Sequence, residues 1–185
     1  MSVNRVPRAL LRHGASSSEA VRTLEVTVRA FDADRVVLRY VLDADLERLI
    51  IPPEDAQRRA HELWMHTCFE ALLAVADAPG YCELNFAPSR AWAMYRFSAR
   101  RQGMAVVTDA RAPQLDMQRT AATVTLDAAV FWHDLMPHAA PLRLLIAMAA
   151  VVEDEGGRLS YWALRHPPGK PDFHHPDSFA LELAL

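Results

Sequence analysis

Residues 63–97 read LWMHTCFEALLAVADAPGYCELNFAPSRAWAMYRF. The stretch contains three aromatic-rich runs, 63–75, 81–87 and 91–97, which are separated only by short turns. Short apolar runs bounded by Asp, Pro and Gly are typical of strands joined by tight connections. The turn ADAPG at 76–80 predicts that the first two runs pair as antiparallel neighbours. We therefore predict a β-meander across this part of the chain.

Four polar residues interrupt these apolar strands: Glu70, Glu83, Asn85 and Arg96. A polar group on a buried strand needs a hydrogen-bonding partner, because its desolvation is otherwise costly. The partner is either another protein group or a ligand. Both interpretations stay open at this point: an internal hydrogen-bond frame, or the floor of a binding cleft.

The rest of the chain is also dominated by strand patterns. Further strands are predicted at 23–30, 36–43, 46–51, 104–108, 120–126, 144–152, 159–166 and 179–185, with a helical turn at 127–132 capped by Asp127. This makes about nine to eleven strands without a long helix, and alternating βαβ units are missing. The sequence predicts an all-β protein, an antiparallel two-sheet β-sandwich of jelly-roll type.

Composition places the chain among ordinary soluble proteins. With 185 residues, 51% of them apolar, we expect one domain over 20–185, preceded by a flexible or loosely docked tail at 1–19. The net charge is -3 and the basic residues are scattered, so we do not expect nucleic acid to be a partner. The longest apolar stretch, 144–152, is too short to span a bilayer. Since Arg12 and His13 also interrupt the N-terminal apolar residues, we expect no membrane partner and a cytoplasmic protein. The sequence leaves the oligomeric state undetermined.

The two cysteines are predicted to be reduced. In the expected hairpin Cys82 lies opposite about residue 74, which leaves Cys68 roughly 20 Å away along the strand. A disulfide requires Cα atoms within about 7 Å.

Two groups of motifs carry a family resemblance. The first is Trp64-x-x-Thr-Cys-Phe-Glu70, followed by Tyr81-x-Glu-x-Asn-Phe-x-Pro-Ser89 and by Trp92-Ala-x-Tyr-x-Phe97. The second is Leu159-Ser-Tyr-Trp-Ala-Leu-x-His166 with Pro171-Asp-Phe-His174 and a final Phe179-x-Leu181. Over roughly residues 20–185 the chain resembles bacterial DOMON-like domains, relatives of the family 9 carbohydrate-binding modules.

That resemblance implies a ligand-binding β-sandwich, with sugars or haem as the ligand classes of the wider superfamily, and implies no catalytic activity. Some relatives are joined to a cell-wall precursor reductase, which points to a sugar-nucleotide context. We therefore expect a non-catalytic module for a carbohydrate or sugar-nucleotide ligand.

Sugar recognition needs an aromatic face and planar polar groups. Trp92, Trp132, Trp162 and Tyr161 are candidate faces, with Glu70, Glu83, Asn85 and Arg96 as polar partners. Of these we expect Trp92 or Trp162 to lie partly exposed beside the polar residues, and Trp64 to be a core residue. The competing interpretation is that strand aromatics fill the core.

Three alternatives stay open. Haem needs axial ligands, for which the candidates are Met65, His66, Met94, Met104, His133, His138 and His166. A metal-dependent enzyme is a second alternative, with His166, Asp172 and His174 as ligands, although the same loop reads equally as a hydrogen-bonded brace for the last hairpin. Finally, Glu70 and Glu83 are a conceivable glycosidase pair, about 10 Å apart in the expected register.

Overall fold

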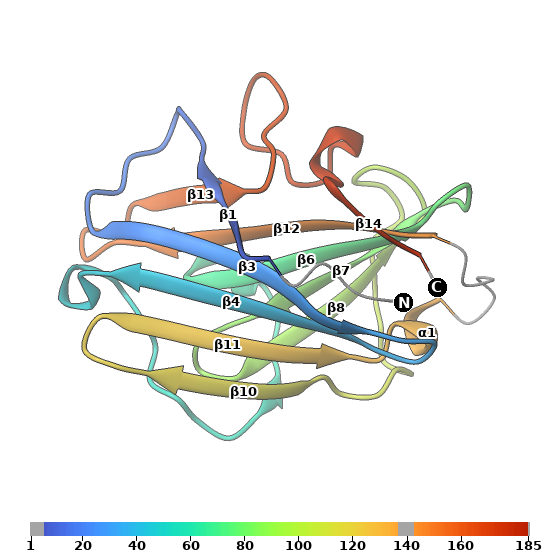
Figure 1. Ribbon diagram of the computed structural model, residues 1–185, viewed down its shortest axis with the longest axis horizontal. Coiled ribbons are helices and arrows are strands. Elements are labelled where there is room, and N and C mark those ends of the chain that lie inside the picture. Colours follow the sequence, from blue (N-terminus) through green and yellow to red (C-terminus); the bar gives the residue numbers. More distant parts are fainter. Residues whose placement is uncertain (1–5, 137–142, 185) are drawn as a thin grey trace.

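The chain folds into two β-sheets packed face to face in a computed structural model that describes residues 6–136 and 143–184 (Figure 1). The smaller sheet has the order β1 (Arg8–Ala9), β3 (Val21–Phe31), β4 (Val36–Ala44), β11 (Thr123–Val130) and β10 (Gln114–Arg119). The larger sheet runs β2 (Leu11–Arg12), β13 (Leu159–Ala163), β12 (Arg143–Glu153), β6 (Cys68–Val75), β7 (Tyr81–Phe86), β8 (Ala91–Phe97) and β5 (Arg58–Arg59). It is completed by β14 (Leu181–Ala184) beside β12 and by β9 (Ala105–Val106) beside β8.

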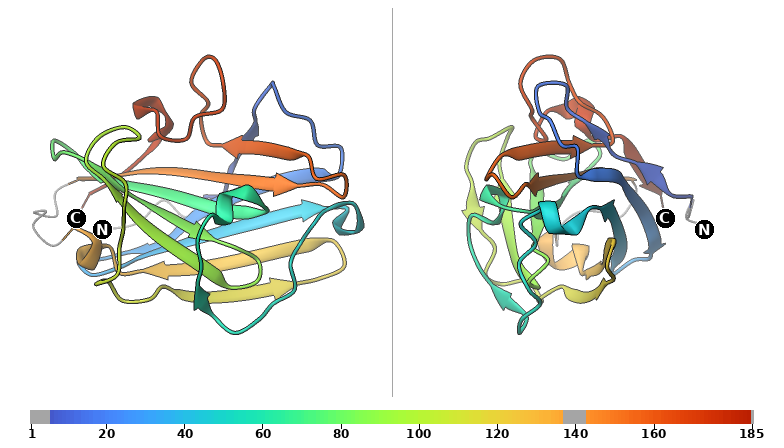
Figure 2. Two further views of the ribbon diagram at one scale, coloured as in Figure 1. Left: turned by 180° about the vertical axis from the view of Figure 1, so that it is seen from behind. Right: turned by 90° about the vertical axis from the view of Figure 1, so that its left-hand side faces the viewer.

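All strand pairs in the described residues are antiparallel except β5 with β8. The predicted β-sandwich is thus confirmed, and Figure 2 shows its two layers from behind and from one end. The described part holds fourteen strands, more than expected, chiefly because two-residue pairings are included. Helical structure there is limited to single turns: η1 (Leu46–Arg48), η2 (Leu63–Met65), α1 (Trp132–Leu135) and η3 (Pro176–Ser178). No helix in this part of the chain has the length and apolar content that a membrane crossing needs.

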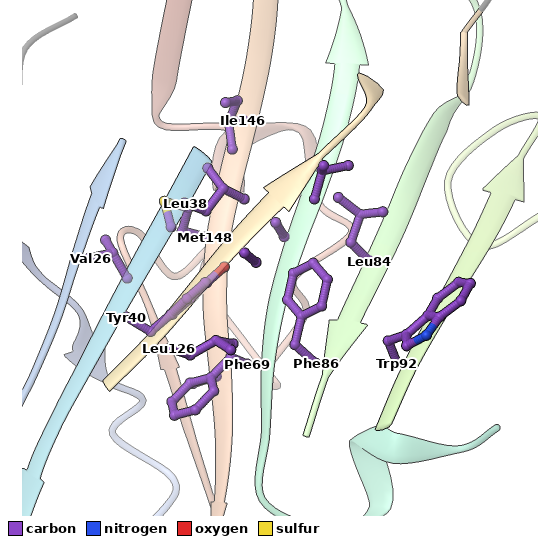
Figure 3. Packing of buried hydrophobic residues seen from close by; sticks show 14 of the residues in the cluster. Val26, Leu38, Tyr40, Phe69, Leu84, Phe86, Trp92, Leu126, Ile146 and Met148 are labelled. Atoms are coloured by element: carbon purple, nitrogen blue, oxygen red, sulfur yellow. The ribbon is translucent and has the colours of Figure 1, made fainter. Parts of the chain in front are cut away.

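The main core lies between the two sheets. Alternate residues of each strand point into it, as the period of two in a strand requires. From the larger sheet these are side chains such as Phe69, Leu84 and Phe86, and from the smaller sheet Leu38 and Tyr40 (Figure 3). The Tyr40 hydroxyl crosses the interface and donates a hydrogen bond of 2.7 Å to the main-chain oxygen of Glu70. A bond of this kind satisfies a buried hydroxyl and ties the sheets together.

The larger sheet is covered on its other face as well. All residues of β7 and nearly all of β6 are buried, so these strands have no solvent-facing side. A second apolar cluster forms on this outer face, where Leu72, Tyr95 and Val151 contact Trp64 and Phe173 from covering loops. Polar groups that point to the outer face therefore lie under loops rather than in water.

Several local predictions are corrected. Residues 46–51 form no strand, since η1 is followed by only a single bridge between Leu49 and Asp154. The strand predicted from residue 63 begins at Cys68. Asp127 caps no helical turn: it lies within β11, where β4 supplies a continuous ladder, and it forms a salt bridge with Arg39.

The described part of the segment 1–19 lies against the sandwich. Short strands in this segment pair with both sheets, β1 with β3 and β2 with β13. Leu10, which lies between them, belongs to the main core. Burial of this leucine is a reason for the segment to dock.

The hairpin register explains why the cysteines stay reduced. Cys82 lies opposite Leu73, one residue from the expected position, and Cys68 pairs with Val151 on another strand. Both thiols are free and buried, which confirms the prediction.

The turn between β6 and β7 depends on Gly80. Its φ of +77° favours glycine, and a Cβ there would lie 2.3 Å from the main-chain oxygen of Phe97. We expect Gly80→Ala to lower the free energy of unfolding by more than about 1 kcal/mol, measured by urea denaturation. Gly14→Ala is the control, because no atom lies within 4 Å of its added Cβ. Equal stability of the two variants would contradict the role of this turn.

Candidate functional site

A cavity of about 580 Å³ opens on the outer face of the larger sheet. Its volume falls in the range of roughly 300–1,000 Å³ that is usual for small-molecule sites. It lies between strands β6, β7, β12 and β13 and the loops that cover them, and its lining includes Trp64, Glu70, Glu83, Arg101, Tyr161, Phe173 and His174.

Strand register places a row of small and polar side chains on the outer face of the larger sheet. Reading across the sheet from β13 to β8, the paired residues are Ala163, Ala149, Glu70, Asn85 and Ala93. Of this row, Glu70 lines the cavity.

Glu83 lies two residues before Asn85 on β7, on the same face of the sheet. The Asn85 amide donates a 2.7 Å hydrogen bond to Oε1 of Glu83. The Cys68 thiol donates a weak bond of 3.5 Å to Oδ1 of Asn85. Glu70 is opposite Asn85, and Glu83 is its diagonal neighbour, so the two carboxyl groups are offset by two residues rather than the expected three.

Aromatic side chains form the walls of the cavity. Trp64, on η2, packs edge-on against Tyr95 at a centroid distance of 5.5 Å. On the other side Tyr161 from β13 packs against Phe173 from the loop before η3. The rim includes Met65, which is 55% exposed. Apolar walls around a polar floor are the usual composition of a small-ligand site.

His174 connects the wall to the floor through a chain of hydrogen bonds. The Arg101 main-chain N–H donates to the Tyr81 hydroxyl at 3.1 Å, and this hydroxyl lies 2.7 Å from Nδ1 of His174. The hydroxyl can accept the Arg101 bond and also donate its proton to Nδ1. In that arrangement Nε2 carries the ring hydrogen and faces Glu83 at 3.5 Å. Burial, helped by the positive charge of Arg101, lowers the pKa of His174 to about 4, so the ring is neutral at neutral pH.

Asp172 fastens the loop that carries Phe173 and His174. Its carboxylate accepts hydrogen bonds from Arg101 at 3.1 and 3.0 Å and also pairs with Arg100. It accepts a further bond of 3.1 Å from the main-chain N–H of His174, while its own main-chain oxygen accepts one from Ser178. Asp172 therefore braces the covering loops, as the structural interpretation of this segment predicts.

The carboxyl pair is electrostatically unusual. Burial, followed by the charge of Glu83, raises the pKa of Glu70 well above its ordinary value. Burial also raises the pKa of Glu83, while the hydrogen bond from Asn85 opposes that shift. The two groups titrate as a pair, and the asymmetry of their donors favours the proton on Glu70. The floor of the cavity thus presents two buried carboxyl groups, of which Glu70 has the stronger tendency to keep its proton and Glu83 has the hydrogen-bond donor.

The structure brings together four of the residues predicted for sugar recognition: Glu70, Glu83 and Tyr161 line the cavity, and Asn85 supports Glu83. Trp92 and Trp162, in contrast, do not lie beside these residues. These two side chains are 5% and 7% exposed and belong to the main core on the opposite face of the sheet (Figure 3 shows Trp92). The expectation of a partly exposed tryptophan at either position is therefore wrong.

Two other candidates lie away from the cavity. Arg96 is paired with Cys82, whose side chain belongs to the main core, and its guanidinium donates to the main-chain oxygens of Leu135 and Asp134 at 3.0 and 3.2 Å. Trp132 is buried in the core and donates to the main-chain oxygen of Asp32. Both are thus bound to structural partners.

Sequence reasoning assigned Trp64 to the core, whereas it is the tryptophan that lines the cavity. His174 enters the site as a hydrogen-bonding residue rather than as a metal ligand. The alternation along β6 contained a usable signal, because Cys68, Glu70 and Leu72 share one face of that strand. The position of η2 over that face is a tertiary feature without a local pattern.

The proposed metal ligands do not converge. Asp172 is occupied by two arginines, and His166 Nε2 lies 2.7 Å from the main-chain oxygen of Leu11. Residues 6–136 and 143–184 contain no group of three or more His, Cys, Asp or Glu that is suited to hold a metal ion. Of the haem candidates, Met94 belongs to the main core, and His138 lies outside the described residues.

Comparison with solved structures relates this architecture to known proteins. A "putative carbohydrate-binding protein" from Bacteroides uniformis superposes with a TM-score of 0.65 at 10% identity, covering 97% of this chain and 86% of that one. The two proteins share the β-sandwich fold. A family 9 module from Caldicellulosiruptor kristjanssonii, solved in complex with glucose, superposes with a TM-score of 0.52 at 9% identity, covering 99% of this chain and 82% of that one. No family model and no curated protein sequence matches the chain.

The raised pKa of Glu70 predicts a pH dependence of stability. The pKa of Glu70 in the folded protein lies above the unfolded value of about 4.3. The contribution of this group to stability is therefore complete below about pH 4.3, and it is lost as the pH rises toward the pKa of the folded state. Glu70→Gln has no such titration. We expect the melting temperature of the variant, relative to the natural chain, to increase from pH 5 to pH 8. Because His174 is present in both proteins, its opposite effect below pH 6.5 cancels in this difference. A difference that is constant with pH would contradict the assignment.

Proposed function

We propose that this protein is a non-catalytic binding module whose ligand, a carbohydrate or sugar nucleotide, occupies the cavity over β6 and β7. The observation that carries the proposal is the combination of aromatic walls and buried carboxyl groups in one cavity of about 580 Å³. A sugar ring has apolar C–H faces and polar edges, and therefore needs both kinds of surface at once.

The walls supply the apolar surface. Trp64 and Tyr161 are each partly buried and stand on opposite sides of the floor, so a ring that enters the cavity meets an aromatic surface from η2 or from β13. Stacking on an aromatic face removes C–H surface from water at a gain of about 25 cal/mol per Å².

The floor supplies the polar partners. The raised pKa of Glu70 favours its protonated form, which offers both an O–H donor and a carbonyl acceptor, whereas Glu83 is an acceptor that Asn85 holds in place. Vicinal hydroxyl groups of a sugar both donate and accept, so they match this arrangement. The fold similarity to two carbohydrate-binding proteins supports the proposal, and the sequence resemblance to DOMON-like domains agrees with it.

Binding is favoured over glycoside hydrolysis by the state of the carboxyl pair. In a hydrolytic pair one carboxylate must be free to act as base or nucleophile. Glu83 accepts the Asn85 hydrogen bond at Oε1, and Oε2 lies 3.5 Å from Nε2 of His174, so the protein constrains this carboxyl group. Aryl-glycoside substrates are accordingly expected to remain intact in the presence of the protein.

The test is a thermal-shift screen followed by calorimetry, because a ligand that binds only the folded state raises the melting temperature. The panel contains glucose, disaccharides, sugar nucleotides and haem. We expect sugars or sugar nucleotides to shift the transition. Trp64→Ala should weaken their binding about tenfold through the loss of an aromatic face.

Trp64→Phe is the matched control, because it keeps an aromatic face at a partly exposed position. It should retain most of the affinity. The proposal fails if no carbohydrate in the panel binds, or if Trp64→Ala binds sugars as well as the natural chain does. A shift with haem alone would assign the protein to the other ligand class.

A further inference from the structure

The side chain of Glu70 contains a buried oxygen atom that lacks a hydrogen-bond partner in the described part of the chain. Its side chain is only 3% exposed, and Oε1 has no hydrogen-bond partner among the described residues. Buried polar atoms in native proteins are nearly always paired, so an unpaired one at the edge of a cavity points to a ligand. Glu70 lines this cavity directly.

The charges around the cavity are unbalanced in one direction. Its ionisable lining residues are Glu70, Glu83, Arg101 and His174. The guanidinium of Arg101 is directed to Asp172, to which it donates two hydrogen bonds, and His174 is neutral. Glu70 and Glu83 therefore face the cavity without a direct ion pair to an arginine of the described residues, and the charge of Arg101 only partly opposes the rise in the pKa of each. A buried carboxylate in this situation keeps its proton instead of its charge.

The aromatic walls of the cavity also favour a positively charged group. Trp64, Tyr161 and Phe173 surround the carboxyl groups with aromatic side chains, whose faces attract cations through their quadrupoles. Aromatic faces combined with carboxyl groups make a favourable site for an ammonium group. The same surroundings repel an anion placed at the floor.

We infer that the ligand carries a protonated amine that lies against Glu70 and Glu83, which makes an amino sugar the ligand class of this cavity. The inference rests on the proposed function, because the sugar ring is taken to contact the aromatic walls. On binding, the ammonium group supplies the missing counter-charge, Glu70 gives up its proton to solvent, and the resulting carboxylate accepts a hydrogen bond from the N–H. The neutral hydroxyl of an ordinary sugar cannot drive this proton release.

The experiment is isothermal titration calorimetry of the full chain with glucosamine, glucose and N-acetylglucosamine at pH 6, where a free amine is protonated. Hydrogen bonds to charged groups are stronger than neutral ones, so we expect glucosamine to bind about ten- to a hundredfold more tightly than glucose. N-acetylglucosamine, whose amide is neutral, should lose this advantage. The binding enthalpy of glucosamine should vary with the ionisation enthalpy of the buffer, which reports proton release.

Glu70→Gln is expected to remove both the preference for glucosamine and the buffer dependence. The matched control is Glu153→Gln. Glu153 is a buried carboxyl of the same sheet that lies 2.7 Å from His66 and is not part of the cavity lining, so this variant should keep the preference. Circular dichroism checks that both variants are folded.

Each other outcome is decisive. If glucose and glucosamine bind equally, the inference is overturned and the proposed function stands. Binding of neither sugar overturns the inference, and the proposed function falls with it only if the disaccharides and sugar nucleotides of the thermal-shift panel also fail to bind. If Glu70→Gln keeps the preference, or if the buffer dependence is missing in the natural chain, Glu70 is not the group that meets the amine.

Discussion

The burial of the larger sheet on both faces is the constraint on which the rest of this structure depends. A sandwich needs only one buried face per sheet, and the smaller sheet follows that rule, with alternating burial along β4 and β11. In β6 and β7 almost every residue is buried. Covering loops are consequently required over the outer face, and polar side chains beneath them must bind one another or a ligand. The cavity is the place where this cover is incomplete.

The strands of the larger sheet were predictable because their apolar runs are long and their turns are distinctive. The hairpin around Gly80 and the strand after residue 143 follow from local pattern alone. The orientation of the aromatic residues was harder to predict. Trp92 and Tyr95 point to opposite faces, yet both are surrounded by apolar residues, so their neighbours in sequence do not reveal which face is the interior. Register would have excluded Arg96, since its partner Cys82 points away from Glu83. The contribution of Trp64 depends on how η2 docks, which no local pattern specifies.

The candidate site divides into parts held in different ways. The floor belongs to paired strands, and the main chain of Glu70 is held from behind by the hydroxyl of Tyr40. The wall that carries Phe173 and His174 is a loop, attached chiefly through Asp172 to Arg100 and Arg101. These ion pairs are partly exposed, so they contribute less to stability than buried packing does. Strand pairing thus fixes the position of the carboxyl groups, whereas the position of the wall depends on a few side-chain ion pairs.

Because the floor belongs to strands and one wall to a loop, substitutions in these two parts are expected to have different consequences in evolution. A substitution on β6 or β7 disturbs the ladder and two apolar clusters at once, so it is removed by selection for folding before selection for binding can act. The loop segments 98–104 and 166–178 cover the outer face but lie outside the strands, and insertions at surface loops cost little free energy. New specificities in proteins of this design should therefore arise through loop length and loop sequence above an unchanged acidic floor.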